Sequence, residues 1–221
     1  NVYIVSSNPT TPNQNTWIES LKKIYYKDYE IPMTENGAID FDVAKEQTIE
    51  NKYEAKDEYK HFVLYVDPDA EIIYGGDDYQ TAKTQVSNSL TAHMDTNGLI
   101  SLSTLANAAI YEAITEKGLE DTCVFNGIAV PKDSEEYLKS GVMSEVILWQ
   151  AYDVGYVAVE AAVSAAKGEL DSDVFQSALS GQDKVEGVST YDADGFKIED
   201  NIISLGEPAI FSLDSVDKFK E

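Results

Sequence analysis

Short apolar runs alternate with runs of helical period along most of the chain. The first run, NVYIV at residues 1–5, predicts a buried strand, and Ile18, Leu21 and Tyr25 then recur on one face of a helix. The same pattern predicts further strands at 71–76, 98–103, 121–130 and 144–149, and helices at 77–93, 104–118, 131–141 and 153–168. Strands and helices therefore follow one another in turn as far as residue 168.

This alternation predicts an α/β fold, in which helices flank the faces of a parallel sheet. The strands are continuous apolar runs, as expected when both faces of a sheet are covered. In open sheets of this kind, ligands bind beyond the carboxyl ends of the strands. The residues that directly follow each strand are therefore the first candidates for a binding site.

Two regions interrupt the alternation. Residues 28–70 are rich in Lys, Glu, Asp and Tyr, with a helical pattern at 43–60 and a strand-like run at 61–66, and we interpret them as an inserted subdomain or hairpin. After residue 168 the helical period is lost, and turn sequences at 181–183 and 192–195 predict β-hairpin material. We expect residues 1–150 to form a ligand-binding lobe and residues 151–221 a crossover helix and tail.

The charge of the chain narrows the classes of partner. Its net charge is -24, and all 16 basic residues are lysine. Such a chain repels phosphate backbones, so we expect no nucleic-acid partner. The absence of arginine also removes the bidentate group that most often binds carboxylates and phosphates, which favours an uncharged ligand.

Residues with catalytic potential are few. Cys123 is the single cysteine and lies in an apolar run, so we interpret it as a buried structural thiol. His61 and His93 fall in no motif that would pair either with a nucleophile, and both are expected at the surface. No nucleotide-binding glycine motif is present, and we expect neither a cofactor nor catalysis.

One acidic segment, residues 190–201, resembles part of a calcium-binding loop. Its first position is Thr190 rather than Asp, and its twelfth is Asn201 rather than Glu. A plain hairpin turn is therefore the favoured interpretation, and no metal site is predicted.

Three consecutive carboxamides follow the first strand, at Asn13, Gln14 and Asn15. A carboxamide both donates and accepts hydrogen bonds without a formal charge, as sugar hydroxyls do, so this position suits a neutral polyol. The simpler interpretation is that Asn13 caps the following helix, while Gln14 and Asn15 lie on the surface of its first turn.

Four segments carry a resemblance to a known family. They are SSNPTTPNQNTWIE, GLISLSTLANAA, the long block at residues 124–170 and SLGEPAIFSLDSVDKF. Together they resemble the periplasmic sugar-binding proteins of ABC importers, in the branch that binds rhamnose or the autoinducer-2 signal. The resemblance implies two α/β lobes that close on a ligand, of which this chain would hold the second lobe and tail without most of the first. It also implies an extracytoplasmic location, an importer permease as partner, and contact with the membrane only through that permease or a lipid anchor.

The resemblance also implies ligand-binding residues. The pair Asn13–Gln14 matches the family's Asp-Gln or Asn-Gln pair, and Asn in place of Asp argues against the autoinducer. Leu102 stands where relatives often have a Pro whose backbone lines the pocket, and Thr104 follows two residues later. Trp149 and Gln150 occupy the hinge, where relatives carry Asn or Asp at the second position. The implied binding residues are thus Asn13, Gln14, Leu102, Thr104, Trp149 and Gln150.

Two other functions compete with this one. The effector-binding domain of a LacI-like transcription regulator has the same fold, although no basic helix-turn-helix is present and the charge of -24 opposes DNA binding. An α/β enzyme that uses Asp77, Asp78 or Asp153 is the weaker alternative, because no spacing pairs a base with a nucleophile.

Overall fold

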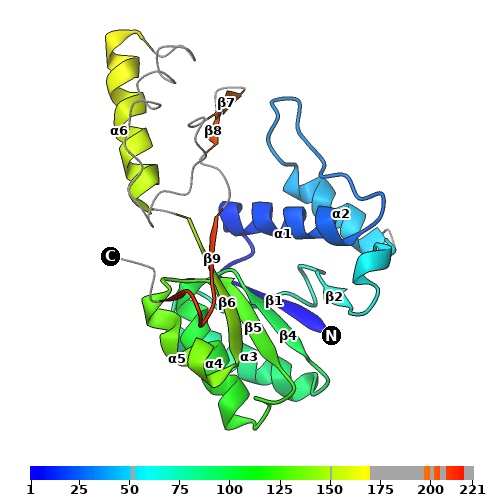
Figure 1. The fold of residues 1–221 in the computed structure, drawn as a ribbon. Helices are drawn as coiled ribbons and strands as arrows, with labels where there is room; N and C mark the ends of the chain where they lie inside the picture. The colour runs from blue at the N-terminus through cyan, green and yellow to red at the C-terminus, as the bar shows by residue number, and fades with distance from the viewer. Residues whose placement is uncertain (51–52, 150, 170–196, 200–201, 205–207, 217–221) are drawn as a thin grey trace. The chain divides into compact units, whose positions relative to one another are not determined.

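The computed structural model describes residues 1–50, 53–149, 151–169, 197–199, 202–204 and 208–216 (Figure 1). These residues form two compact units. The first comprises Asn1–Ala129 and Glu136–Ser144, and the second comprises Val130–Glu135 and Glu145–Glu221.

The first unit is built on a parallel sheet. Its strands are β1 (Val2–Ser6), β2 (Leu64–Tyr65), β3 (Ile73–Tyr74), β4 (Gly98–Ser101) and β5 (Val124–Ile128), and β6 (Met143–Leu148) continues from this unit into the second. The strand order is β2-β1-β4-β5-β6-β9, where β9 is Ala209–Phe211, and β3 is also paired to β1. Each of β2, β3 and β4 runs parallel to β1, and β5 runs parallel to β4. The α/β class and the parallel sheet flanked by helices are confirmed.

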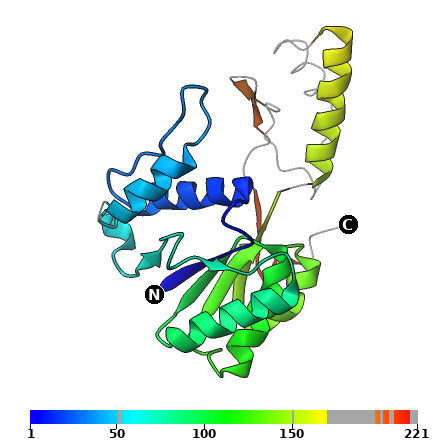
Figure 2. The same ribbon diagram turned by 180° about the vertical axis from the view of Figure 1, so that it is seen from behind.

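Helices cover both faces of this sheet (Figures 1 and 2). On one face, α1 (Pro12–Tyr25) buries Ile18 and Tyr25 against Ile4 of β1. On the other lie α3 (Tyr79–Ala92) and α4 (Thr104–Glu116), which pack on each other and bury Val86 and Ile110 completely. Helix α4 ends at Lys117–Gly118, where Gly118 has a φ of 65°, the left-handed conformation in which glycine costs least. The η2 turn (Lys132–Ser134) and α5 (Glu135–Ser140) follow β5.

Strands β2 and β3 lie end to end along the same edge of β1. Tyr65 pairs with Tyr3 and Ile73 with Val5. Residues 66–72 therefore form a loop away from β1, and the chain rejoins β1 only two residues further along that strand. The Glu71 carboxylate closes this loop by accepting hydrogen bonds from the backbone N–H groups of Val66 and Asp67, each at 2.9 Å.

The segment 28–70 differs from the prediction in two ways. The helix expected at 43–60 is α2 (Phe41–Glu50), and a separate short 3-10 turn, η1 (Asp57–Tyr59), follows it. Between them Ala55 forms a β-bridge to Tyr26, which holds the chain against the end of α1 and prevents one continuous helix. The strand-like run at 61–66 contributes β2 to the main sheet, so the segment is neither a free hairpin nor a separate subdomain.

The second unit contains α6 (Ala151–Lys167), β7 (Lys197–Glu199), β8 (Ile202–Ser204) and β9 (Ala209–Phe211). Strands β7 and β8 form an antiparallel pair, as predicted for hairpin material in the tail, and β9 runs antiparallel to β6. The predicted turns at 181–183 and 192–195, and the calcium-like segment, lie outside the described residues apart from 197–199. On α6, Val154, Val159 and Val163 are exposed.

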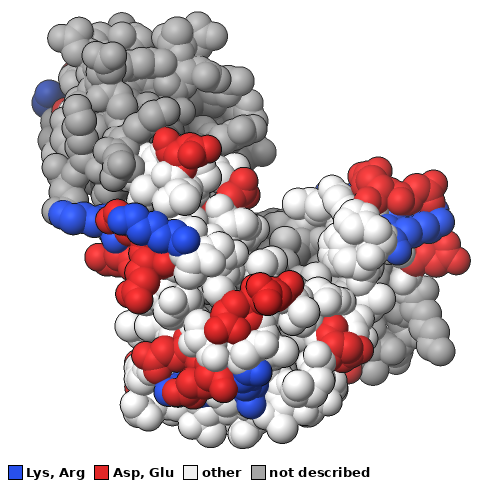
Figure 3. All heavy atoms as spheres, turned by 60° about the horizontal axis from the view of Figure 1, so that its bottom comes forward, with Lys and Arg blue, Asp and Glu red and all other residues white. Residues whose placement is uncertain are grey.

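The surface is acidic, in keeping with the composition. Figure 3 shows Asp and Glu side chains at several places on one face, with fewer Lys among them. Surface ion pairs such as Lys45–Asp69 and Lys83–Glu112 are at least partly exposed, whereas the Glu19–Lys22 pair is buried. Within the described part of the chain, no helix is both long and apolar enough to cross a membrane.

Candidate functional site

The turn between β1 and α1 is held by the carboxamide of Gln14. Its Oε1 accepts hydrogen bonds from the Ser6 hydroxyl and the Ser7 backbone N–H, both at 2.7 Å, and its Nε2 donates to the Ser7 hydroxyl at 3.1 Å. Gln14 is only 7% exposed. Its side chain therefore fastens the first turn of α1 to the carboxyl end of β1, and it is not a surface residue.

Asn13 lies beside Gln14 on α1 and is exposed. Helix α1 begins at Pro12, and its N-cap is Thr11, so Asn13 is not the cap. The simpler interpretation of the amide cluster is therefore wrong for both Asn13 and Gln14. Asn15 is half-buried and donates from Nδ2 to the Pro9 carbonyl at 2.8 Å.

The neighbouring strand β4 places two further predicted residues at the same end of the sheet. The Leu102 backbone N–H donates to the Val5 carbonyl at 2.9 Å, which extends the β1–β4 pairing by one residue. The Leu102 side chain is buried in the hydrophobic cluster with Ile4 and Ile18, so only its backbone is suited to line a polar site. Thr104 is exposed and is the first residue of α4.

The two remaining predicted residues belong to the second unit. Trp149 directly follows β6 and is 44% exposed. Gln150 lies outside the described residues. The structure thus brings Asn13, Gln14, Leu102 and Thr104 to the carboxyl ends of the adjacent strands β1 and β4.

Helix N-termini at this edge of the first unit differ in how they are capped. At α3, the Asp78 side chain accepts a hydrogen bond from the Thr81 backbone N–H at 2.9 Å, and hydrogen bonding to the Thr81 side chain and backbone lowers the pKa of the carboxyl group. At α1 and α4, the N-cap residues Thr11 and Ser103 make no side-chain cap hydrogen bond. The first-turn N–H groups of α1 and α4 therefore face the edge without a side-chain acceptor.

Sequence reasoning missed Asn107, a buried polar residue near this edge. Its Nδ2 donates to the Ile128 carbonyl at 3.0 Å, and its Oδ1 is the buried side-chain atom that lacks a hydrogen-bond partner among the described residues. A Cβ at Gly127 would lie 3.2 Å from that oxygen and 2.7 Å from the Ser101 Cβ. Only glycine at position 127 lets β5 approach the Asn107 amide so closely. The hydrogen bond from Asn107 to Ile128 therefore joins α4 to β5. A lone Asn in the alanine-rich stretch 104–113 was the available signal.

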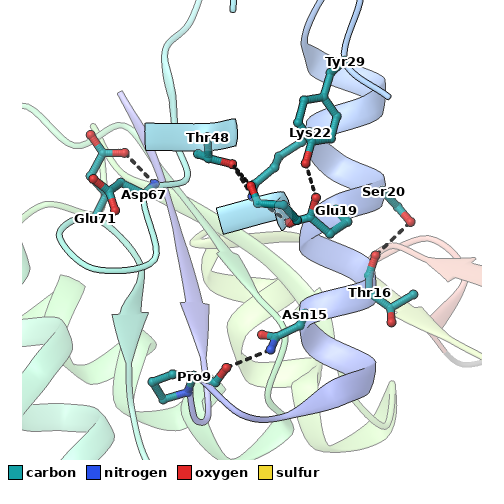
Figure 4. Close-up of polar contacts among 11 residues, drawn as sticks. Pro9, Asn15, Thr16, Glu19, Ser20, Lys22, Tyr29, Thr48, Asp67 and Glu71 are labelled. Atoms are coloured by element: carbon teal, nitrogen blue, oxygen red, sulfur yellow. Dashed lines mark hydrogen bonds and ion pairs between the residues drawn. The ribbon is translucent and has the colours of Figure 1, made fainter. Parts of the chain in front are cut away.

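A second feature of the first unit is a cavity between α1, α2 and the loop 66–72, which we call the α1–α2 pocket. Its volume is about 250 Å³, and its walls are Pro9, Asn15, Ile18, Glu19, Lys22, Phe41, Asp42, Lys45, Pro68, Asp69, Ile72 and Tyr74. Figure 4 shows the polar contacts around it. The residues Asn15, Ile18, Glu19 and Lys22 are three or four apart, so one face of α1 forms one wall.

Two of these wall residues, Glu19 and Lys22, form a buried ion pair. Lys22 Nζ lies 2.6 Å from Glu19 Oε1 and donates to the Thr48 hydroxyl of α2 at 2.7 Å. The Tyr29 hydroxyl donates to the other Glu19 oxygen (Figure 4). Burial, followed by this hydrogen bond to the carboxylate, raises the pKa of Tyr29. The pair neutralises itself and ties α1 to α2.

Both histidines are exposed, and burial raises the pKa of the Cys123 thiol to about 11. Among the described residues, no three His, Cys, Asp or Glu side chains converge as a metal site would require.

Comparison with known families gives one match. The model described as a periplasmic binding protein domain matches residues 1–170, which include the segment 28–70. No curated protein matches the chain.

Several solved structures share the fold. A sugar ABC transporter protein from Actinomyces odontolyticus is 22% identical, with a TM-score of 0.63. A solute-binding protein from Clostridium phytofermentas with bound L-rhamnose is 18% identical, with a TM-score of 0.66. LsrB from Clostridium saccharobutylicum in complex with AI-2 is 18% identical, with a TM-score of 0.54. These matches cover 100%, 97% and 100% of this chain, which spans 57%, 57% and 70% of the three structures.

Proposed function

Because the chain belongs to the periplasmic binding protein domain family, we propose that it binds a neutral sugar or sugar-like ligand for import by an ABC transporter. The family consists of substrate-binding proteins rather than enzymes, so the proposed function is binding without chemistry. The ligand class is rhamnose-like or autoinducer-2-like, after two of the structures with the same fold.

The observation that carries this proposal is the set of uncharged polar groups at the carboxyl ends of β1 and β4, where the nearby carboxylates of Asp77 and Asp78 already accept hydrogen bonds from Asn8 and Thr81. Asn13 and Thr104 are exposed there, and the first turns of α1 and α4 lack side-chain caps. Such an edge offers backbone N–H donors together with a hydroxyl and a carboxamide, which both donate and accept. Sugar hydroxyls match these groups, whereas a charged ligand would meet no compensating charge from them.

The predicted binding residues take different roles in this proposal. Asn13 and Thr104 contact the ligand through their side chains, and Leu102 contributes its backbone. Gln14 fixes Ser6 and Ser7, so it shapes the turn that carries Asn13. Trp149 supplies an apolar ring face for a sugar, and Gln150 supplies a further carboxamide.

The remaining parts of the proposal follow from the family. The partner is an importer permease, and the protein works outside the cytoplasm, either free in the periplasm or attached to the membrane through that permease or a lipid anchor. A LacI-like effector domain has less support, because the structures with TM-scores above 0.5 named above are transport proteins and the charge of -24 opposes DNA.

A thermal-shift titration tests the proposed function. L-rhamnose, D-ribose and autoinducer-2 are added to the chain, and at least one is expected to raise its melting temperature, because a ligand that binds the folded state stabilises it. Thr104→Val and Asn13→Leu are expected to reduce that rise, whereas the matched changes Thr84→Val and Asn88→Leu on α3 leave it unchanged. Equal rises in all four variants would refute the site, and no rise with any sugar would refute the ligand class.

A further inference from the structure

We propose that the α1–α2 pocket is a second ligand site, which binds a neutral polyol no larger than a monosaccharide. It lies within the first unit, on the face of α1 that meets α2. It does not depend on the sugar site proposed at the strand ends, where Asn13 and Thr104 are exposed.

The size of the pocket sets the upper limit on its ligand. Its volume of about 250 Å³ is just below the usual range for small-molecule sites, about 300–1,000 Å³. The walls combine apolar side chains, such as Ile18 and Ile72, with a few polar groups. That mixture is typical of a site that encloses a small ligand and orients it by a few hydrogen bonds.

Four of the five charged side chains that line the pocket are paired within the protein, and Asp42, which is exposed on α2, forms no ion pair with a described residue. Glu19 and Lys22 form the buried pair at its back, 4% and 2% exposed. At its rim, Lys45 Nζ lies 2.8 Å from Asp69 Oδ1 and links α2 to the loop 66–72. An anion would be repelled by Asp42 or would have to displace a carboxylate from Lys22 or Lys45, whereas a neutral ligand leaves both pairs intact.

Two uncharged groups in the walls retain hydrogen-bonding capacity. Asn15 uses one N–H of its amide on the Pro9 carbonyl, and its Oδ1 has no partner among the described residues. The Tyr74 hydroxyl likewise has no partner within the described part of the chain. Burial, followed by the nearby charges of Asp69 and Asp67, raises the pKa of Tyr74 to about 12. Tyr74 therefore stays a neutral donor and acceptor at physiological pH, and with Asn15 it can bind two hydroxyls of a polyol.

The test is a ¹⁵N-resolved NMR titration of the chain with erythritol. Saturable shifts are expected for the Asn15 side-chain amide and for the backbone amides of Tyr74 and Lys45. Tyr74→Phe and Asn15→Leu should each weaken binding roughly two- to tenfold, the loss expected for one hydrogen bond. Tyr111→Phe is the control, because it removes a half-buried hydroxyl from α4, outside the pocket.

Each outcome decides the proposal. The proposal is supported if erythritol shifts the pocket resonances and both variants weaken this binding. If Asn15→Leu fails to fold, Tyr74→Phe still provides the test, because it leaves the Asn15–Pro9 hydrogen bond intact. No shift at Asn15 or Tyr74, or equal affinity in Tyr74→Phe and the wild type, would overturn it. Saturation by ethylammonium or acetate but not by erythritol would also overturn it, since the ligand would then be charged. Shifts confined to Asn13 and Thr104 would overturn the second site while supporting the first.

Discussion

Replacing Gln14 by Met tests whether one carboxamide holds the β1–α1 turn. Met has nearly the volume of Gln, so the substitution removes hydrogen bonds without opening a large cavity. The change deletes the three bonds that join Gln14 to Ser6 and Ser7. At roughly 1 kcal/mol for each bond, the free energy of unfolding should fall by about 3 kcal/mol. Ser6 and Ser7 are 0% and 7% exposed, so water cannot readily replace the lost partner.

The assay is urea denaturation followed by circular dichroism. Gln85→Met is the matched control, because Gln85 is exposed on α3 and the change should alter stability by less than about 0.5 kcal/mol. If Gln14→Met costs no more than Gln85→Met, these bonds do not fix the turn, and the role given to Gln14 is wrong. If it costs about 3 kcal/mol, Gln14→Met should also weaken sugar binding, since Asn13 is carried by the same turn.

Three further predictions concern other groups of the first unit. Lys22→Met alone should destabilise the chain by about 3–5 kcal/mol because it leaves the buried Glu19 charge unpaired, whereas adding Glu19→Leu should recover most of that loss in a double-mutant cycle. Asp78→Ala should lower the free energy of unfolding near neutral pH, whereas Asp78→Asn should keep the helix cap. The folded-state pKa of Asp78 lies below its usual 3.8, so the stability lost in the Ala variant should be seen above that value and should vanish as the pH falls through the folded-state pKa. Urea denaturation at about pH 7 and pH 2 measures this difference. Cys123 should react slowly with a thiol reagent at about pH 8 in the folded chain and rapidly in denaturant, since burial raises its pKa to about 11, and fast reaction of the folded chain would contradict its burial.

The fold class was predictable because apolar runs and helical periods reflect burial directly. The predicted strand at 98–103 is β4 at Gly98–Ser101, and the predicted helix at 104–118 is α4 at Thr104–Glu116. The prediction was wrong in residues 43–60, where the pattern favoured one helix. There the bridge between Tyr26 and Ala55 and the pairing of β2 with β1 join residues far apart in the sequence, which local periodicity does not encode.

The candidate site was predictable in position but not in the direction of its side chains. The sequence placed Asn13 and Gln14 after a strand, and both lie at the carboxyl end of β1. That Gln14 turns inward depends on Ser6 and Ser7, whose hydroxyls lie beneath α1. The buried pair of Glu19 and Lys22 could likewise not be predicted from the sequence, because its hydrogen bonds with Thr48 and Tyr29 form only when α2 packs on α1.

The most direct test of the central claim is an NMR titration of the ¹⁵N-labelled chain with L-rhamnose. Saturable shifts are expected at Asn13 and its side-chain amide and at the backbone amides of Leu102 and Thr104, because the ligand is proposed to lie at the carboxyl ends of β1 and β4. Unchanged spectra at saturating sugar, or shifts confined to other parts of the sheet, would contradict it.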